Sequence, residues 1–463
     1  MYCCELTLRL PPVVSVGSPP LVLYVVGYFT GRTAGAKLYG AVRKEGGVMQ
    51  RVCAVLGGVW WLLAQPACAE LAAGVVQQVF FPYAAGKPSV PGLTPGTVIS
   101  RETWESATDY LPPEILDRVK AGELQFSIQE TTDLPVSEAY IEATRKYAEQ
   151  VTITPDGELE GYVAGLPFPI LDPADPHAGL KAAWNMRHRD FGDTMQVWNT
   201  FRIVSESGSP VREIENYYVV AYGMHRPLVD GMNPNRWERE GILYKEFFHI
   251  TSPFDVKNSM MLKHRYVRDQ ANDDNWAYTP AGRKIRKVIL KHEDASYDSG
   301  FLNEDFFGFW GYIRSYEWKM LGKKRLLAPV GIKATSATFG GRGAWYPVDP
   351  WELREVIVLQ GTPRASDHPY SKRVLYIDQQ MFVPLYVLLY NRDGKHQKTL
   401  FELYGNPQYN AGNEHVRVPL WVGESMIDYD GHCASMTVVT KILYNQLLPD
   451  DFFHLEKIVA RGQ

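Results

Sequence analysis

The second half of the chain is dominated by short segments in which apolar and polar residues alternate with a period of two, as in half-buried β-strands. In the segment 195–204, Met195, Val197 and Phe201 share one face, and the segment 259–266 alternates in the same way. The other segments that the pattern predicts as strands are 217–222, 242–250, 284–290, 316–321, 353–359, 373–377, 384–390, 396–404, 416–422 and 435–443.

Ten or more strands that follow one another with turn signals and few helices predict a meander that curls into a barrel or an open half-barrel. The Asp393-Gly394 pair marks one hairpin turn. The segment 217–222 is apolar on both faces, whereas a sheet backed by solvent is polar on one side. We therefore expect both faces to be covered, by helices, by a second sheet, or on one side by an apolar ligand.

The region before these strands shows helical signals instead. Pro113 opens an amphipathic run that includes Ile115 and Val119, and Ser137 occupies an N-cap position before a predicted helix over 138–150. A connector rich in glycine and proline follows, over residues 161–181, and its prolines forbid regular structure. We expect a helical N-terminal region over residues 70–160 and an antiparallel β half-barrel domain over residues 161–463.

Residues 49–69 carry the three-part pattern of a secretory signal. Arg51 supplies the positive charge, residues 52–64 are uncharged and apolar, and Ala67-Cys68-Ala69 supplies small residues for cleavage after Ala69. The apolar run is too short to span a bilayer, and a buried core helix is the alternative. We predict that residues 1–48 are a non-native leader, that Met49 is the true start, and that the mature protein is periplasmic. An outer-membrane lipoprotein acylated at Cys68 is the rival form.

The mature chain is acidic and has a single cysteine. Removal of residues 1–69 leaves 42 Lys and Arg against 50 Asp and Glu, a net charge of −8, which argues against a nucleic-acid partner. Cys433 alone remains of the five cysteines, so neither an internal disulfide nor a CxxC metal site is available. Aromatic residues make up 13% of the chain, which suits a large β-rich core or an aromatic-lined ligand cavity.

Sequence motifs typical of catalytic sites are scarce. The mature chain lacks the HExxH, GxSxG, SxxK and Walker motifs, and Gly340-Gly341-Arg342-Gly343 is better explained as a flexible loop than as a phosphate cradle. Asp172, Asp175 and His177 are better explained as turn residues of the connector than as metal ligands, and Cys433 as a small buried apolar residue. We assign no catalytic residue, metal or cofactor, although a triad assembled from distant residues remains open.

Several local motifs carry a resemblance. One is a strand, turn and basic strand with Trp276, Tyr278, Pro280, Arg283 and Arg286, and another is the hairpin that starts at Arg373-Val374. Both resemble the LolA/LolB-like superfamily of periplasmic carriers. Residues 161–169, the segment 181–185 with Trp184 and Asn185, and residues 305–309 more specifically resemble a long bacterial family of unknown function named for outer-membrane lipoprotein sorting.

The resemblance implies a curved antiparallel half-barrel closed by helices, and a carrier of lipids, lipoprotein acyl chains or other hydrophobic compounds rather than an enzyme. It also implies partners in the envelope, such as a resistance-nodulation-division type exporter or an outer-membrane protein. The chain is about twice as long as a minimal carrier and has room for a second cavity or docking surface. The resemblance therefore does not decide whether the cargo is a lipoprotein. An exported hydrolase and a purely structural envelope protein are the alternatives. Aromatic and methionine side chains on strands are the candidates for lining the cavity: Met195, Trp198, Tyr218, Met260 and Trp318.

Overall fold

The computed structural model describes residues 70–227, 235–296 and 300–462. The predicted leader and signal peptide, residues 1–48 and 49–69, lie outside the described residues. Within the described ranges, the helices are too short and too polar to cross a bilayer.

One large sheet of 14 strands dominates the described part of the chain, in the order β10-β9-β8-β7-β6-β5-β22-β21-β20-β19-β18-β17-β13, with β14 beside β20. All neighbours are antiparallel except β14 and β20. The strands are β5 (Thr194–Ser205), β6 (Pro210–Tyr222), β7 (Ile242–Ser252), β8 (Met260–Tyr266), β9 (Asp274–Thr279), β10 (Lys284–Val288), β13 (Tyr316–Ala328), β14 (Val330–Ile332), β17 (Glu352–Pro363), β18 (Tyr370–Asp378), β19 (Pro384–Asn391), β20 (His396–Gly405), β21 (Leu420–Asp428) and β22 (Cys433–Tyr444).

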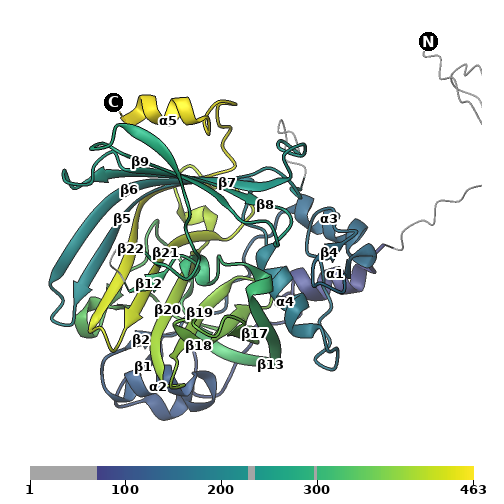
Figure 1. Cartoon of the computed structure of the whole chain (residues 1–463). Helices are drawn as coiled ribbons and strands as arrows, with labels where there is room; N and C mark the ends of the chain where they lie inside the picture. The colour runs from purple at the N-terminus through teal and green to yellow at the C-terminus, as the bar shows by residue number, and fades with distance from the viewer. Residues whose placement is uncertain (1–69, 228–234, 297–299, 463) are drawn as a thin grey trace, which may run out of the picture. The chain divides into compact units, whose positions relative to one another are not determined.

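The sheet consists of two meanders, which we call the first wing (β5–β10) and the second wing (β13 and β17–β22). The last strand, β22, pairs with the first, β5, so that the two wings form one continuous sheet. Figure 1 shows this sheet bent into a deep curve. Its two edge strands are β10 and β13. The prediction of a mainly β fold with a curved, open antiparallel sheet and few helices is confirmed.

The remaining elements are helices and short strand pairs. The helices are α1 (Ala73–Phe80), α2 (Pro113–Lys120), α3 (Glu138–Tyr147), α4 (Ala178–Arg187) and α5 (Leu455–Gly462), with 3-10 turns η1 (Trp104–Tyr110), η2 (Ala148–Gln150), η3 (Phe306–Gly308), η4 (Ile313–Ser315), η5 (Arg342–Ala344) and η6 (Pro407–Tyr409). The short pairs are β1 (Val98–Ile99) with β2 (Phe126–Ser127), β3 (Thr152–Ile153) with β4 (Leu159–Glu160), β11 (Ala295–Ser296) with β12 (Phe301–Leu302), and β15 (Phe339–Gly340) with β16 (Tyr346–Pro347).

Both faces of the sheet are covered, which explains why several strands are apolar on both sides. The concave inner face packs against α4 and the segment 301–315, and the outer face of the second wing packs against α2 and its neighbours. The outer face of the first wing is covered by residues 448–459, including α5, which Figure 1 shows lying across β9. Of the covers expected from the sequence, the described residues supply helices, and loops that were not predicted complete the cover.

Most predicted strands match the observed ones within a few residues, and Ser137 caps α3 as predicted by accepting a hydrogen bond from the Tyr140 amide. The prediction of a strand over 416–422 is wrong, because β21 begins at Leu420 and runs to Asp428. Val416 and Val418 are buried in the preceding loop, so their apolar alternation reflects burial rather than a strand. Helices α4 and α5 were not predicted.

Candidate functional site

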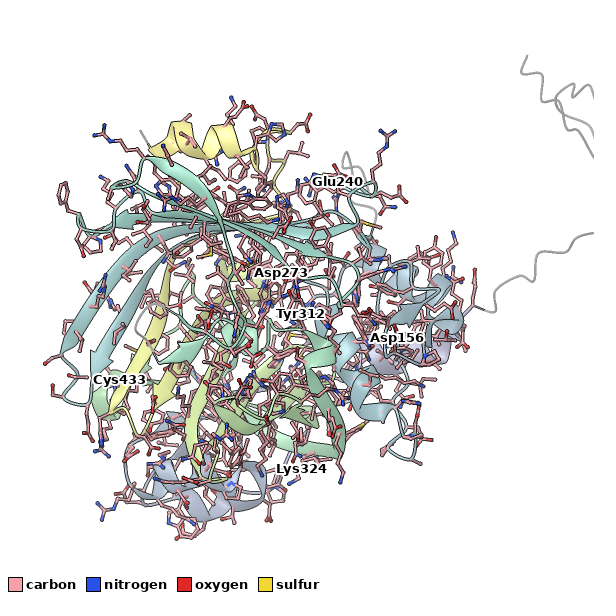
Figure 2. The ribbon with its side chains drawn as sticks, in the orientation of Figure 1. Asp156, Glu240, Asp273, Tyr312, Lys324 and Cys433 are labelled. Atoms are coloured by element: carbon pink, nitrogen blue, oxygen red, sulfur yellow. The ribbon has the colours of Figure 1, made fainter. Side chains whose placement is uncertain are left out.

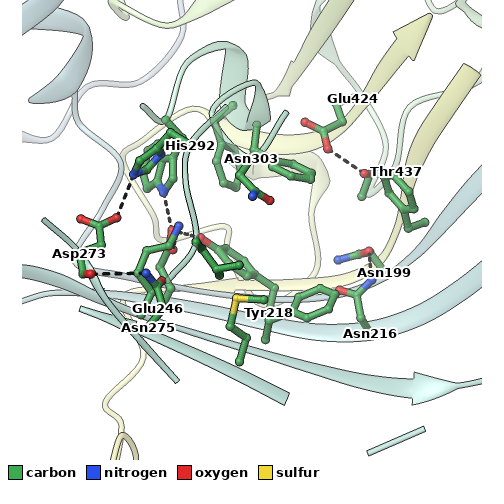
Figure 3. A pocket seen from close by; sticks show the side chains of 18 of the residues that line it. Asn199, Asn216, Tyr218, Glu246, Asp273, Asn275, His292, Asn303, Glu424 and Thr437 are labelled. Atoms are coloured by element: carbon green, nitrogen blue, oxygen red, sulfur yellow. Dashed lines mark hydrogen bonds and ion pairs between the residues drawn. The ribbon is translucent and has the colours of Figure 1, made fainter. Parts of the chain in front are cut away.

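A cavity of about 150 Å³ lies between the inner face of the first wing and the segment 301–315, and we call it the inner-face cavity. Its lining from the sheet includes side chains of β5 to β9, β21 and β22, while Phe306, Phe307 and Trp310 form the opposite wall. Figure 3 shows that polar groups gather at its two ends, with Glu424 and Thr437 at one and Asp273 and His292 at the other.

The wall segment is held in place by a buried ion cluster. Arg373 forms ion pairs with Glu304 and with Asp305, the latter at 3.3 Å, and all of these side chains are almost fully buried. His368 and Tyr316 also hydrogen-bond Glu304. Burial alone raises the pKa of Glu304, but Arg373 and its hydrogen-bond partners outweigh this effect and lower the pKa to about 2. The cluster therefore anchors the residues directly before Phe306 and Phe307.

The backbone of the wall segment has a conformation that requires glycine. Gly308 has a φ of 77°, and a Cβ atom there would lie 2.6 Å from the Pro384 ring. Phe307, with a φ of 52°, adopts the same left-handed region, and Arg189 donates a hydrogen bond to its carbonyl oxygen. The tight turn points Phe307 at the inner face, where its ring packs edge-on against Trp421.

One end of the cavity is charged and internally balanced. The Asp273 carboxylate forms an ion pair with Arg265 at 2.6 Å and a hydrogen bond with His292 Nε2 at 3.1 Å, while its backbone amide donates to the Tyr312 hydroxyl (Figure 2). Nearby, Glu246 accepts hydrogen bonds from Tyr218 at 2.8 Å and forms an ion pair with Lys263. Burial alone raises the pKa of Asp273, but Arg265 and the hydrogen bond with His292 outweigh this effect. The net pKa of Asp273 therefore lies below its usual value.

The other end is acidic without a matching cation. Glu402 on β20 and Glu424 on β21 are direct cross-strand partners and are 0% and 1% exposed. Thr437 on β22 lies opposite Glu424 and donates to its Oε1 atom at 3.0 Å, and Trp421 donates to Glu402 Oε2 at 3.0 Å. Burial, and the like charge of the neighbouring carboxylate, raise the pKa of Glu402 far above its usual value. Burial also raises the pKa of Glu424.

The five cavity candidates chosen from the sequence are dispersed. Tyr218 lines the inner-face cavity, and Met195 is fully buried on the same face of the sheet without lining the cavity. Trp198 stacks on Tyr217 and Met260 packs beneath α5, both on the outer face of the first wing. Trp318 lies at the edge strand β13 and donates to the Ile313 carbonyl oxygen. Alternation alone identified two faces, but not which one is concave.

The family-motif residues mostly hold the fold together. Asn185 is fully buried and hydrogen-bonds both the amide and the carbonyl oxygen of Phe168 in the connector, and Trp184 donates to the Gly157 carbonyl oxygen. Trp276 and Tyr278 lie on the outer face of β9, where Tyr278 packs into the cluster beneath α5. The two arginines of the motif are exposed: Arg283 in the β9–β10 turn and Arg286 on β10.

The other candidates behave as turn and loop residues. Asp172 and Asp175 accept hydrogen bonds from backbone amides two residues later, which confirms their turn role, and Asp175 also pairs with Lys181. Among the described residues no cluster of His, Cys, Asp and Glu could hold a metal. Arg342 in the glycine-rich segment pairs with Glu123, so this loop is tied to a carboxylate.

Cys433 is half-buried at the start of β22, so the prediction of a buried residue is wrong. The described histidines make no hydrogen bond with Cys433 or with a serine hydroxyl, and His292 and His368 pair with carboxylates instead.

The sequence-based search missed Glu402 and Glu424. Each stands at a position of a strand where alternation calls for an inward apolar residue, within Leu400–Tyr404 and Val422–Met426. That violation of the pattern was a usable signal, because charged residues are almost never fully buried without a reason. The motif Asp305–Phe309 was noticed for its resemblance, and the structure adds that its Phe306 and Phe307 form the cavity wall.

Comparison with known proteins gives one family and several similar folds. The model of the family described as "Protein of unknown function (DUF1329)" matches residues 98–441. A putative outer membrane lipoprotein-sorting protein domain from Vibrio parahaemolyticus is 18% identical, with 62% of this chain and 100% of that chain covered and a TM-score of 0.43. A DUF1329 family protein from Desulfovibrio piger ATCC 29098 is 16% identical, covers 62% and 99%, and has a TM-score of 0.43. A LolA superfamily protein from Nitrosomonas europaea is 15% identical, covers 58% and 93%, and has a TM-score of 0.34. No curated protein matches the chain.

Proposed function

The chain belongs to the DUF1329 family, a family of proteins of unknown function, and from this premise we propose that it is a periplasmic carrier that holds the apolar part of a hydrophobic ligand in the inner-face cavity. The membership confirms the resemblance drawn from the connector and the Trp184-Asn185 motif. One observation carries the functional proposal: the concave face of the sheet and the wall segment border a space whose lining exposes mainly apolar surface, with Phe201, Phe307 and Trp310 among the side chains that supply it.

The size of the cavity limits what enters it. A cavity of about 150 Å³ is comparable with one that accommodates benzene, so a ring or a short branched group fits and a whole acyl chain does not. Burial of six carbon groups at about 0.8 kcal/mol each contributes about 5 kcal/mol before the costs of association. Even without those costs, this gain corresponds to a Kd no tighter than about 0.1–1 mM. Tighter binding requires a polar contact inside the cavity. It can also come from the part of the ligand that stays outside, if that part contacts Leu290 and Lys291 beside His292.

Location and partners form part of the same proposal. Cleavage after Ala69 delivers the mature chain to the periplasm, or acylation of Cys68 anchors it to the outer membrane. N-terminal sequencing distinguishes the two forms, since the first begins at Glu70 and the second has a blocked terminus. An envelope exporter or outer-membrane protein that exchanges cargo with this carrier is supported by the family resemblance, and crosslinking in cells tests it.

A fluorescence titration tests binding in the cavity directly. N-phenylnaphthylamine, a neutral dye with three aromatic rings, is expected to place one ring in the cavity and to show saturable fluorescence enhancement with the mature protein. Ile214→Trp fills the cavity and is expected to weaken binding at least about tenfold, equivalent to about 1.4 kcal/mol. Val211→Trp is the matched control, because Val211 lies on the same strand but is 67% exposed. Urea midpoints verify that both variants fold. Absence of saturable binding, or equal binding by Ile214→Trp, contradicts the proposal.

A further inference from the structure

The acidic end of the inner-face cavity has hydrogen-bond acceptors that the described residues do not satisfy. Glu424 lines the cavity, is 1% exposed, and has no hydrogen-bond donor at its Oε2 atom. Asn216 lines the same cavity, is 4% exposed, and its Oδ1 atom also lacks a donor. A buried acceptor without a donor costs about 1–3 kcal/mol, so a group that supplies donors at this place gains that free energy on binding.

The charge at this end is also unbalanced. Neither Glu402 nor Glu424 forms an ion pair with a cation in the described part of the chain, in contrast to Glu246 and Asp273 at the other end. Burial disfavours the charged form of both carboxyls, and the charge of Glu424 disfavours that of Glu402 further, so the adjacent pair shares a proton rather than ionising fully. One shared proton leaves the pair with one negative charge. The two oxygen atoms that share this proton, one from each carboxyl group, retain lone pairs that can accept further hydrogen bonds.

We infer that the ligand enters with a hydrogen-bond donor foremost, a hydroxyl or a protonated amine on a ring-sized apolar body, and that Glu424 accepts this donor. This inference rests on the proposed carrier function and adds the chemistry of the cargo. The hydroxyl or ammonium group lies at Glu424, while the apolar body contacts Phe201, Ile214 and Phe307, which line the cavity. A carboxylate in the same place is repelled by Glu424.

Four matched compounds separate these possibilities. Para-hexylphenol and para-hexylbenzylamine present a hydroxyl and an ammonium, whereas para-hexylanisole presents neither and para-hexylbenzoate presents a negative charge. Displacement of bound N-phenylnaphthylamine measures each affinity on the mature protein. We expect the phenol and the amine to bind at least about tenfold more tightly than the anisole, as expected for a hydrogen bond to a charged group of about 1.5–3 kcal/mol. The benzoate is expected to bind most weakly.

Substitutions assign the preference to the acidic end. Glu424→Gln removes the charge and keeps the shape, so the amine is expected to lose its advantage over the anisole while the phenol retains part of its own. Glu424→Leu removes both acceptor oxygens and is expected to bring all four affinities within about threefold of the anisole. Glu317→Gln is the control, because the Glu317 side chain on β13 is 69% exposed and does not line the cavity.

The outcomes separate failure of this inference about the cargo from failure of the proposed carrier function. Equal affinities of the four compounds on the wild-type protein, or a preference that survives Glu424→Leu, overturn the inference while the carrier function stands. If neither the dye nor any of the four compounds binds, the carrier function itself fails. A preference for the amine alone identifies a cationic cargo, and a preference for both donors identifies a hydroxylated one.

Discussion

Substitution of Arg373 by methionine tests how the cavity wall is held. Arg373 is fully buried and is the cation that faces Glu304 and Asp305 at the base of the wall segment. Methionine preserves much of the volume but leaves two buried carboxyls without their cation. Removal of one partner of a buried ion pair costs about 3–5 kcal/mol.

The pKa of Glu304 gives a second estimate of this cost. Its fall from 4.5 to about 2 corresponds to about 3 kcal/mol of stability, at about 1.4 kcal/mol per unit. This stability is present above the unfolded-state pKa and is lost as the pH falls towards 2. In Arg373→Met, burial dominates and raises the pKa of Glu304, so the variant loses stability as the pH rises. The difference between the two proteins therefore grows with pH.

Urea unfolding followed by tryptophan fluorescence at about pH 4.5 and about pH 7.5 measures both effects. Arg364→Met is the control, because the Arg364–Glu317 pair is 58% and 69% exposed and is expected to contribute about 0–1 kcal/mol. We expect a loss of about 3–5 kcal/mol for Arg373→Met at the higher pH and a clearly smaller loss at the lower pH. A loss no greater than that of the control, or one independent of pH, refutes the reasoning.

Four further predictions follow from single residues. Asn185→Leu is expected to cost about 2–4 kcal/mol in urea unfolding, because the amide and carbonyl groups of Phe168 lose their partners. Gly308→Ala is expected to cost about 2–4 kcal/mol and to weaken dye binding, since a Cβ atom would strike Pro384 at a left-handed backbone position. Ile458→Ala on α5 is expected to cost about 2–4 kcal/mol with unchanged dye affinity, because this residue packs on the outer face; a changed affinity would contradict that placement. Glu424→Gln is expected to flatten the dependence of stability on pH between about 5 and 8, because the raised pKa of Glu424 makes the native wild-type protein lose stability as the pH rises; equal slopes in the two proteins would refute this.

The sequence was sufficient to predict most of the strands, since alternation and turn residues are local signals. The hairpin through Asp393-Gly394 connects β19 to β20 as predicted, and the strand pair around Pro280 forms β9 and β10. Alternation states only that two faces differ, and burial of both faces removes the contrast between them. Trp198 and Met260 were therefore assigned to the cavity, although they face a cluster completed by the short helix α5.

The cavity depends on contacts between distant segments, and local patterns do not encode these. Its wall comes from Phe306 and Phe307, whereas its acidic end comes from Glu424, more than one hundred residues later. No motif or spacing in the sequence predicts that these residues line the same cavity. The inward-facing positions of Glu402 and Glu424 were visible in the sequence as a break in the alternation. This break marked two unusual buried carboxyls, but it did not show that Phe306 and Phe307 form the wall across the cavity.

The carrier function is tested most directly by native mass spectrometry of the protein purified from the periplasm. We expect the wild-type protein to carry a small apolar compound that leaves on collisional activation, and we expect Ile214→Trp to be free of it while Val211→Trp retains it. Identification of a hydroxyl or amino group on the released compound supports the role of Glu424. Wild-type protein that carries no compound and binds no dye in solution contradicts the account.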